Sequence, residues 1–364
     1  GHGAALPMGR LMEAAHPVPD ESSLRASEAV LDMAASAGEG DLFLLALTGG
    51  ASALLPAPAE GLELEDLRRT TRLLLESGAD IASINAVRSH LSRIGGGGLA
   101  LAAHPADMLG LLVSDVVGDD VSVIGSGPLA ANAATFDDCL EVMRSYKLID
   151  TAPGRVLDRL RRGAAGDVPE TPKPGDPVFE SVRQEVVSSN VIALDAAAVR
   201  ARKLGYSPMV LSSRITGEAR EVARFFTAVA LETARARRPL APPACLLMGG
   251  ETTVHVRGRG LGGRNQEMAL ASALELEGVP SVAVLCAGTD GSDGPTDAAG
   301  AFAFGDTVGR ARAMGLEPEA FLAENDSYHF FDHLGDLLRT GPTRTNVMDM
   351  AIALAAKPVE GEAP

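Results

Sequence analysis

The sequence predicts an α/β protein of two domains with a mainly parallel sheet. Short apolar runs alternate with helical patterns along most of the chain, as in proteins whose helices connect parallel strands. A proline-rich stretch, ARRPLAPPA, interrupts this alternation at residues 236–244 and is the best candidate for a linker. We therefore expect a first domain over 1–235, a smaller α/β unit over 245–354 and a frayed tail over 355–364.

Each element of the first domain has a local signal. Continuous apolar runs predict buried strands, and apolar residues spaced three or four apart predict helices. Strands are expected within 41–50, 106–120 and 207–213, a short strand and a helix within 188–205, and helices over 62–78, 135–148 and 217–237. Thr135 is predicted to cap the helix that follows it.

The second domain shows the same alternation with fewer elements. The expected order is the strand CLLMGG, a half-exposed strand in ETTVHVR, the helix NQEMALASALELEG, the strand SVAVLCAG and a terminal helix that opens in TGPTRTNVMD. The chain starts with GHGAALPMGR, which has no initiator Met and no capping or strand signal, so we expect it to begin inside a domain.

Charge and cysteine content exclude several classes of partner. The formal net charge of −16 argues against a surface that binds nucleic acid or an acidic membrane, although a local basic pocket for a small anion stays possible. The three widely spaced cysteines indicate buried reduced thiols and a cytoplasmic protein. No signal peptide and no apolar run long enough for a membrane span is found in the sequence.

Glycines follow two of the predicted strands. The run DLFLLAL leads into TGGAS, where Gly49, Gly50 and the start of a helix near Ser52 suit a carboxylate or a phosphate. A plain strand-to-helix turn is the alternative. The second strand ends at Asp115, which could bind a metal, accept a proton or cap a turn, and the segment GSGP follows it. Upstream, Arg88 could meet a substrate anion or lie on a solvated helix face.

The segment GRGLGGRNQE contains a G-x-G-x-x-G pattern at Gly258, Gly260 and Gly263. This pattern is a weak dinucleotide signal here, because the preceding ETTVHVR alternates polar and apolar residues, whereas a dinucleotide-binding first strand is continuously apolar. Arg264 is more informative, because a guanidinium among glycines at a helix start can bind phosphate through two hydrogen bonds. An unpaired surface arginine is the alternative.

The stretch AGTDGSDGPTDAAGA, at residues 287–301, follows a predicted buried strand. Its spacing does not fit an EF-hand, which requires ligands at alternate positions and a closing Glu. Asp290 and Asp293 are close enough to face one Mg²⁺ or its waters, and Mg²⁺ commonly takes one or two carboxylates together with substrate phosphates. Asp297 is expected to cap a following helix, and Asn346 is a candidate polar contact.

Several ordered blocks carry a family resemblance. They include AAHPVPDESS, LTGGASALLP, ETPKPGD, GEAREVA, GGETTV, GGRNQE, AGTDGSDGPTDAAGA and TGPTRTNVMD, and they extend from residue 1 to about 352. Together they resemble the glycerate 2-kinases whose C-terminal half is called the MOFRL domain. Some bacterial members of that family carry a hydroxypyruvate reductase name.

The resemblance implies a Rossmann-like first domain, a MOFRL domain and an active site in the cleft between them. It also implies phosphorylation of D-glycerate by ATP and Mg²⁺ in a monomer or a homodimer. The family's functional arginine in GGRNQE corresponds to Arg264, and its lysine in a GKA-type segment would lie upstream of Gly1. The family usually has basic residues where this chain has Ser89, Gly95 and Gly98, Thr in place of Leu129 and Gly in place of Arg344.

These observations give one assignment of the site. Arg264 and Asp115 are the candidate catalytic residues. The remaining candidates are Gly49, Gly50, Ser52 and Arg88 for the substrate, Ser126, Gly127, Gly263, Asn265 and Asn346 for the nucleotide phosphates, and Asp290 and Asp293 for the metal. The alternatives are a hydroxypyruvate reductase that uses NAD(P)H and an inactive sugar-acid-binding homologue.

Overall fold

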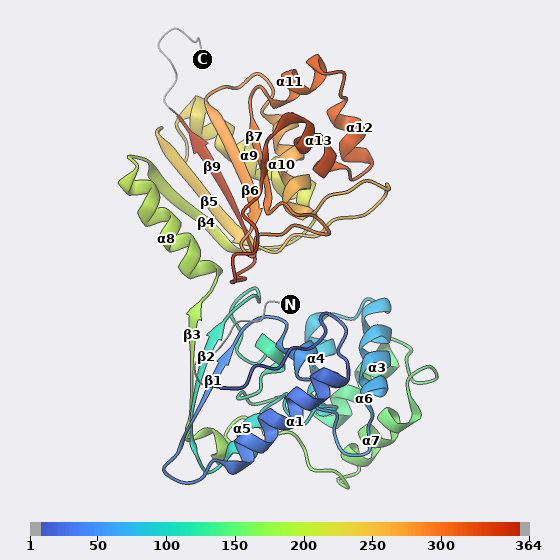
Figure 1. Cartoon of the computed structure of the whole chain (residues 1–364). Coiled ribbons are helices and arrows are strands. Elements are labelled where there is room, and N and C mark those ends of the chain that lie inside the picture. The colour runs from blue at the N-terminus through green and yellow to red at the C-terminus, as the bar shows by residue number, and fades with distance from the viewer. Residues whose placement is uncertain (1–8, 357–364) are drawn as a thin grey trace. The chain divides into compact units, whose positions relative to one another are not determined.

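The computed structural model describes residues 9–356 and divides the chain into two compact units (Figure 1). The N-terminal unit contains residues up to 113 and 119–187, and the C-terminal unit contains 114–118 and 188 onward. The boundary expected at residue 235 was therefore wrong. Strand β4 (Ser207–Ile215) pairs in parallel with β5 (Ala244–Gly250), so the chain around the expected linker connects two parts of one sheet.

The N-terminal unit is built from seven helices, two short 3₁₀ turns and three strands among the described residues. Its helices are α1 (Glu21–Ser36), α2 (Ala51–Leu54), α3 (Leu64–Glu76), α4 (Ile81–His90), α5 (Gly98–Ala103), α6 (Phe136–Ser145) and α7 (Gly154–Ala164). Its strands are β1 (Leu42–Leu47), β2 (Asp107–Val113) and β3 (Val182–Ser188), and its 3₁₀ turns are η1 (Ile124–Ser126) and η2 (Pro177–Phe179).

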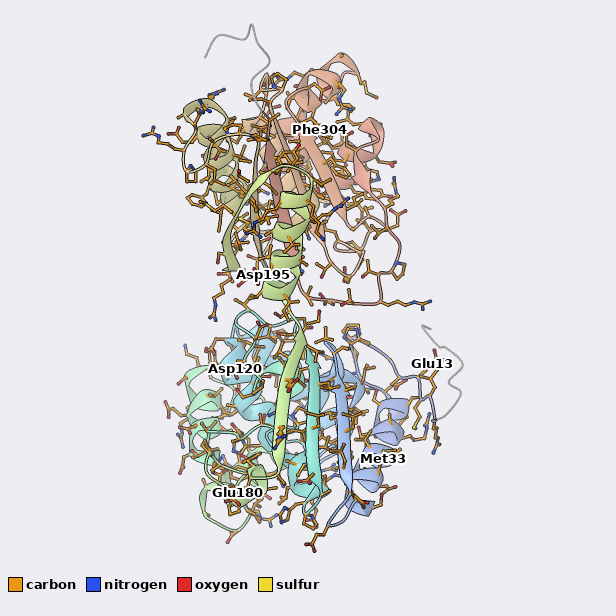
Figure 2. All side chains as sticks on the ribbon, turned by 90° about the vertical axis from the view of Figure 1, so that its left-hand side faces the viewer. Glu13, Met33, Asp120, Glu180, Asp195 and Phe304 are labelled. Atoms are coloured by element: carbon orange, nitrogen blue, oxygen red, sulfur yellow. The ribbon has the colours of Figure 1, made fainter. Side chains whose placement is uncertain are left out.

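The three strands form a sheet in the order β1-β2-β3. Strands β1 and β2 are parallel, and β3 also runs parallel, because Met108 N–H donates to Ser181 O and Ser114 N–H donates to Ser188 O. Helices α1 and α5 pack on one face around a core that includes Phe43. In Figure 2 the other face of the sheet has no helix in front of it. The parallel sheet expected for the first domain is confirmed here, and the described helices of this unit lie on one of its faces.

The C-terminal unit has a larger, mixed sheet. Its helices are α8 (Asn190–Lys203), α9 (Ala219–Ala236), α10 (Arg264–Glu275), α11 (Thr307–Ala313), α12 (Pro318–Ala323) and α13 (Ser327–Leu334). Besides β4 and β5, its strands are β6 (Val282–Gly288), β7 (Gly300–Phe304), β8 (Leu337–Leu338) and β9 (Asp349–Ala355), and the sheet order is β4-β5-β9-β6-β7-β8. Within this sheet β4 and β5 are parallel, and the other neighbouring strands are antiparallel.

Helices cover both faces of this mixed sheet. Helices α9 and α10 pack on one face, where Phe226, Met248 and Met268 belong to the main core. Helix α8 packs on the other face, where Leu194 and Leu247 belong to a second cluster (Figure 1). Strand β5 is buried along its whole length, which explains its continuously apolar sequence.

Two expected elements of the C-terminal unit were wrong. The terminal helix is instead β9, a central strand between β5 and β6, because pairing on both edges overrides the helical preference of its alanines. The segment ETTVHVR forms no strand and has a single bridge, from Thr253 to Glu218. The predicted cap is confirmed, because Thr135 and Asp138 exchange hydrogen bonds at the start of α6.

Candidate active site

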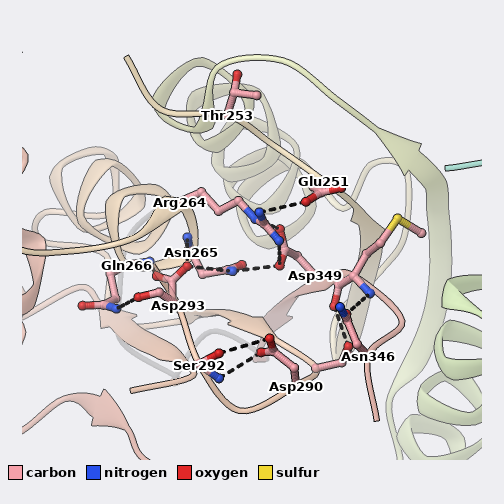
Figure 3. A network of polar contacts seen from close by, with 12 residues as sticks. Glu251, Thr253, Arg264, Asn265, Gln266, Asp290, Ser292, Asp293, Asn346 and Asp349 are labelled. Atoms are coloured by element: carbon pink, nitrogen blue, oxygen red, sulfur yellow. Dashed lines mark hydrogen bonds and ion pairs between the residues drawn. The ribbon is translucent and has the colours of Figure 1, made fainter. Parts of the chain in front are cut away.

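Arg264 is the first residue of α10, and two carboxylates hold its guanidinium (Figure 3). Its Nε and Nη2 donate to Asp349 at 2.5 and 3.0 Å, and its Nη1 lies 2.9 Å from Glu251 Oε1. Glu251 directly follows β5, and Asp349 begins β9, so two neighbouring strands supply the two acids. Arginine carries five N–H donors, and this arrangement uses three of them.

Asp293 accepts hydrogen bonds from the first turn of α10. Its Oδ1 accepts the backbone N–H of Asn265 at 3.1 Å and the side-chain amide at 3.2 Å, and its Oδ2 accepts the N–H of Gln266 at 2.8 Å. The approach requires glycine at position 263, because a Cβ there would lie 2.4 Å from Asp293 Oδ1. Asp293 thus takes the place of an N-cap side chain and fixes the start of the helix that carries Arg264.

Two of the acids near Arg264 have raised pKa values. Burial raises the pKa of Glu251; Arg264 opposes this shift, and the charges of Asp349 and Asp115 reinforce it. Burial also raises the pKa of Asp293 despite the N–H groups that it accepts. Asn265 completes the cluster by donating from Nδ2 to Asp349 at 3.0 Å.

Asp115 lies in the short segment 114–118 that belongs to the C-terminal unit. It is half-buried, and burial raises the pKa of its carboxyl group. Its charge acts on Glu251, which places it in the electrostatic surroundings of Arg264. A carboxylate with a raised pKa is a stronger base than an ordinary aspartate and is therefore better suited to accept a proton.

Asp290 and Asn346 lie on two loops that run together. Asp290 accepts the backbone N–H and the hydroxyl of Ser292, at 2.9 and 3.1 Å. The two loops are joined where Thr343 N–H donates to Asp290 O and where a Cβ on Gly291 would lie 2.1 Å from the carbonyl oxygen of Gly341. Asn346 is exposed, and its Oδ1 accepts the N–H of Met348 at 3.0 Å.

The fit of these acids to Mg²⁺ is partial. Residues 9–356 contain no group of three His, Cys, Asp or Glu side chains that could hold a metal ion. This is compatible with Mg²⁺, which usually takes one or two carboxylates and fills its remaining positions with water and phosphate oxygens. Asp290 is half-exposed, and within residues 9–356 its carboxylate oxygens bond only to Ser292, whereas those of Asp293 are already used by α10.

The TGGAS turn after β1 forms a second group of candidate residues in the N-terminal unit. Gly50 has a φ of 83°, a conformation that favours glycine, and it precedes a helix of only one turn. The imidazole of His16 lies over this turn, since a Cβ on Gly50 would lie 3.1 Å from His16 Nε2. Gly49 and Ser52 are half-buried on the same turn.

The GSGP segment meets this turn. The hydroxyl groups of Ser52 and Ser126 lie 2.9 Å apart. Ser126 has a φ of 64° and Gly127 a φ of 60°, so the backbone here is left-handed, which is uncommon for a serine and recurs at functional sites. The N–H groups of Gly96 and Gly97 donate to the carbonyls of Ser126 and Gly127, both at 2.8 Å.

Arg88 lies in the last turn of α4 and is half-buried. Burial lowers the pKa of its guanidinium. Among the described residues no side chain or carbonyl is within hydrogen-bond or ion-pair distance of it. A cation in such surroundings is suited to an anionic ligand.

The comparisons with known proteins agree on one family. Residues 1–161 match a domain of unknown function, DUF4147, and residues 244–349 match the MOFRL family. A D-glycerate 2-kinase of Thermotoga maritima is 41% identical over 94% of this chain and 79% of its own length. The chain belongs to the glycerate 2-kinase family.

A solved structure and a second sequence support this membership. The crystal structure of the glycerate kinase of Thermotoga maritima superposes with a TM-score of 0.90 at 40% identity, covering 97% of this chain and 82% of that one. An Agrobacterium vitis protein that carries the provisional name of a hydroxypyruvate reductase is 41% identical over 97% of this chain and 90% of its own length. The expected family and its two α/β domains are therefore confirmed.

Three residues near the candidate sites, Glu251, Asp349 and His16, were not predicted from the sequence. Glu251 and Asp349 both lie in blocks that carried the resemblance. Glu251 follows the carboxyl end of β5, where ligands of α/β sheets commonly bind, whereas Asp349 is the first residue of β9. His16 lies in another such block, but only the structure shows its approach to Gly50. Of the departures from the family pattern, Leu129 is buried in the core and Arg344 has a left-handed φ of 64°, which suits the glycine usual there.

Asp297 was predicted to cap a helix, and this was wrong. The element that follows it is strand β7. Its carboxylate accepts the hydroxyl of Tyr328 at 2.8 Å and pairs with Arg339 at 3.2 Å.

No helix among residues 9–356 combines the length and the apolar character that a membrane crossing requires.

Proposed function

We propose that this chain is a glycerate 2-kinase, which transfers the γ-phosphoryl group of ATP to the 2-hydroxyl of D-glycerate. The observation that supports this most strongly is the fixed guanidinium of Arg264 at the glycine-flanked start of α10, in a chain that is 41% identical to a D-glycerate 2-kinase. Phosphoryl transfer depends mainly on positioning and on neutralising charge, and a fixed guanidinium contributes to both.

Arg264 has the donors that this role requires. Asp349 and Glu251 occupy three of its N–H groups and hold the plane of the guanidinium, which leaves two N–H groups for phosphoryl oxygens. Gly263 and Asn265 flank it, and we assign both to the phosphates together with Asn346. The surrounding acids make the cluster negative, so the bound phosphates require additional positive charge.

Mg²⁺ bound with ATP would supply this positive charge. We assign Asp290 as the main carboxylate for the ion or its waters. Asp293 is assigned beside it, where its hydrogen bonds to the first turn of α10 connect the metal site to the helix that carries Arg264. Asp115 is assigned to orient the 2-hydroxyl and accept its proton, because its half-buried carboxyl group has a raised pKa and acts on the same cluster.

D-Glycerate is assigned to the N-terminal group of candidate residues. Arg88 offers its half-buried guanidinium to the carboxylate of the substrate, and the turn of Gly49, Gly50 and Ser52 offers backbone N–H groups and a hydroxyl to its oxygens. Ser126 and Gly127 are assigned to the phosphate on the basis of their left-handed backbone and the contact between Ser126 and Ser52. The three free, buried thiols are compatible with a reducing compartment such as the cytoplasm.

The competing function is a hydroxypyruvate reductase, because one relative carries that name. The G-x-G-x-x-G pattern gives it little support, since β5 ends at Gly250 and no strand leads directly into these glycines. A Cβ on these glycines would meet Glu324, Asp326 and Asp293, so close packing explains the pattern.

One pair of assays separates these functions. ADP release is measured with ATP, Mg²⁺ and D-glycerate, and NADH and NADPH oxidation is measured with hydroxypyruvate. The kinase proposal expects turnover only in the first assay and 2-phosphoglycerate as the product identified by ³¹P NMR. Product phosphorylated at the 3-hydroxyl would correct the regiochemistry. Turnover only in the second assay would establish the reductase, and glycerate-dependent thermal stabilisation without turnover in either assay would indicate an inactive binding protein.

A further inference from the structure

A long irregular segment connects β5 to α10. It runs from Glu251 to Gly263 without a helix or strand, and we call it the arginine loop after Arg257 and Arg259. Its two ends meet at the candidate site, because Glu251 at its start pairs with Arg264 directly after its end. Loops longer than about 12–15 residues inside a compact domain are usually functional or disordered.

This loop is fixed by buried side chains. Asn325, which is 8% exposed, accepts the backbone N–H groups of Arg257 and Gly258 through Oδ1, at 2.7 and 3.0 Å. Its Nδ2 donates to Glu267 Oε2 at 2.7 Å and to the carbonyl of His255 at 3.3 Å. One amide therefore holds the loop at three backbone positions and joins it to α10.

The anchor extends into the helix that carries Arg264. Glu267, which is 1% exposed, lies in the first turn of α10 and also accepts Arg220 Nε and Nη2 at 3.0 and 2.8 Å. Both carboxylate oxygens of Glu267 accept hydrogen bonds, and the proposed chemistry gives this buried acid no role. Its contacts instead tie the arginine loop to the turn that begins with Arg264.

Glycines allow the loop to dock this closely. A Cβ on Gly258 or Gly260 would lie 2.3 Å from atoms of Glu324 or Asp326. Gly260 N–H donates to Glu324 O at 2.9 Å, and Leu261 N–H donates to Asp326 Oδ1 at 2.8 Å. The backbone is thus held along its length, while its outer side chains stay exposed.

The exposed side chains are suited to an anion with an apolar part. Val256 is 76% exposed, and Arg257 and Arg259 are exposed. Neither arginine side chain has an ion pair within the described part of the chain, whereas Arg224, Arg312 and Arg339 of the same unit are each paired with two carboxylates. Fixing two unpaired cations on a loop of a protein with net charge −16 favours an anionic ligand.

We propose that the arginine loop binds the polyphosphate of the nucleotide through Arg257 and Arg259, and that Asn325 is the positioning residue that fixes the loop for this purpose. The proposal rests on the kinase function in naming ATP as the anion. Preorganising the loop lowers the ordering cost of binding, so loss of the anchor weakens nucleotide binding even though Asn325 itself does not contact the ligand.

The test compares the double variant Arg257→Ala/Arg259→Ala, the anchor variant Asn325→Ala and the control Arg200→Ala/Arg202→Ala. The control removes two exposed arginines at the same spacing from α8 of the same unit. ATP binding is measured by calorimetry with MgATP, and KM for ATP, KM for D-glycerate and kcat are measured where turnover occurs. Thermal unfolding of each variant gives the temperature range in which that variant is folded.

We expect the double variant and Asn325→Ala each to weaken ATP binding about tenfold or more, since each lost charge-assisted contact is worth about that factor. KM for D-glycerate should stay within about twofold, and the control should match the wild type. A folded double variant with unchanged ATP affinity would overturn the proposal. If the double variant weakens ATP binding but folded Asn325→Ala binds ATP as the wild type does, the positioning role of Asn325 is overturned.

The outcomes separate this inference from the kinase function. If the wild-type protein binds ATP but does not phosphorylate D-glycerate, the proposed function fails while the calorimetric comparison still decides on the loop. If D-glycerate is phosphorylated and the double variant keeps its KM for ATP, the loop inference alone fails. A purely structural role for Asn325 predicts lower thermal stability with unchanged ATP affinity at temperatures where the variant is folded.

Discussion

Arg264 and Asp349 form a two-point contact in which Nε and Nη2 of the guanidinium donate to the two carboxylate oxygens, at 2.5 and 3.0 Å. The contact joins the first residue of α10 to the first residue of β9. Because two parallel hydrogen bonds fix both the position and the plane of the guanidinium, Arg264 is held rigidly before any ligand binds.

The geometry predicts that lysine cannot replace Arg264. Arg264→Lys keeps the charge but loses the planar pair of donors, and Arg264→Ala also leaves Asp349 and Glu251 without their cation. We expect kcat/KM for D-glycerate phosphorylation to fall by about 10³-fold or more in Arg264→Ala, as for other arginines that stabilise a transferring phosphoryl group. Arg264→Lys should recover only part of this loss.

Arg224→Ala is a suitable control for these variants. Arg224 is exposed and pairs with Glu221 and Glu275, so its loss also removes two carboxylate contacts, but far from the cluster in sequence and on the outer surface of α9. Its kcat/KM should equal that of the wild type. Activity of Arg264→Ala within about tenfold of the wild type would remove Arg264 from the catalytic assignment.

Substitutions of Asp290 and Asp293 should have different effects, one on the Mg²⁺ requirement of the reaction and the other on the free energy of unfolding. Asp293→Asn disturbs three hydrogen bonds to the first turn of α10, and the loss of such a cap costs about 0.5–2 kcal/mol. Asp290→Asn changes a loop carboxylate that bonds only to Ser292, so its free energy of unfolding should change little.

Chemical denaturation and Mg²⁺ titrations of activity distinguish these roles. We expect a higher Mg²⁺ concentration for half-maximal activity in Asp290→Asn, and both a lower free energy of unfolding and lower activity in Asp293→Asn. An unchanged Mg²⁺ requirement in Asp290→Asn would show that this carboxylate does not serve the ion. Unchanged stability in Asp293→Asn would contradict its role at the helix start.

Asp115 should determine the acidic limb of the pH–rate profile. Burial raises its pKa above the ordinary aspartate value of 3.8, and a base must be deprotonated to act, so kcat/KM should fall as pH decreases through this raised pKa. Asp115→Asn should lower kcat by about 10²–10⁴-fold, the usual contribution of a positioned base, and should remove this limb.

The same shift has a defined sign for stability. A carboxyl group with a raised pKa in the folded state binds its proton more readily there than in the unfolded chain, so its contribution is full below the unfolded value and is lost as pH rises through the folded value. Relative to the wild type, Asp115→Asn should therefore become more stable as pH rises through that window. Denaturation at a series of pH values measures this difference, and a difference independent of pH would contradict it.

Local patterns predicted the elements that local physics determines. The apolar run of β5 and the capping pair of Thr135 and Asp138 depend on neighbouring residues, and both appear as expected. Strand β9 could not be predicted in this way, because its alanines favour a helix and only pairing with β5 and β6 makes it a strand. The expected domain boundary was wrong for the same reason, since β4 pairs with β5 across the proline-rich segment that lies between them in sequence.

The sequence predicted those parts of the candidate site for which residue type and neighbouring residues indicate the chemistry. Arg264 among glycines indicated phosphate, but nothing local indicated that Asp349, 85 residues further along the chain, would pair with it. Asp293 shows the converse, because its acidic loop suggested a metal ligand while the fold uses its oxygens at the start of α10. Contacts between segments that are distant in sequence decide such roles.

Arg88 gives a final prediction in which binding and stability change in opposite directions. Arg88 is half-buried, and no residue among 9–356 offers it a hydrogen bond or a carboxylate, so its desolvation costs free energy that these residues do not offset. Arg88→Met keeps much of the apolar stem and removes the charge. We therefore expect its free energy of unfolding to equal or exceed that of the wild type, while KM for D-glycerate rises about 10–100-fold from the loss of one charge-assisted contact.

Arg93→Met is the matched control, since Arg93 is exposed, pairs with Glu28 and donates to the carbonyl of Pro58. It should lose a little stability and keep the wild-type KM for D-glycerate. Urea denaturation and steady-state kinetics measure both quantities, and D-glycerate should raise the Tm of the wild type and of Arg93→Met but not of Arg88→Met. A destabilised Arg88→Met with an unchanged KM would show that this guanidinium serves the fold and not the substrate.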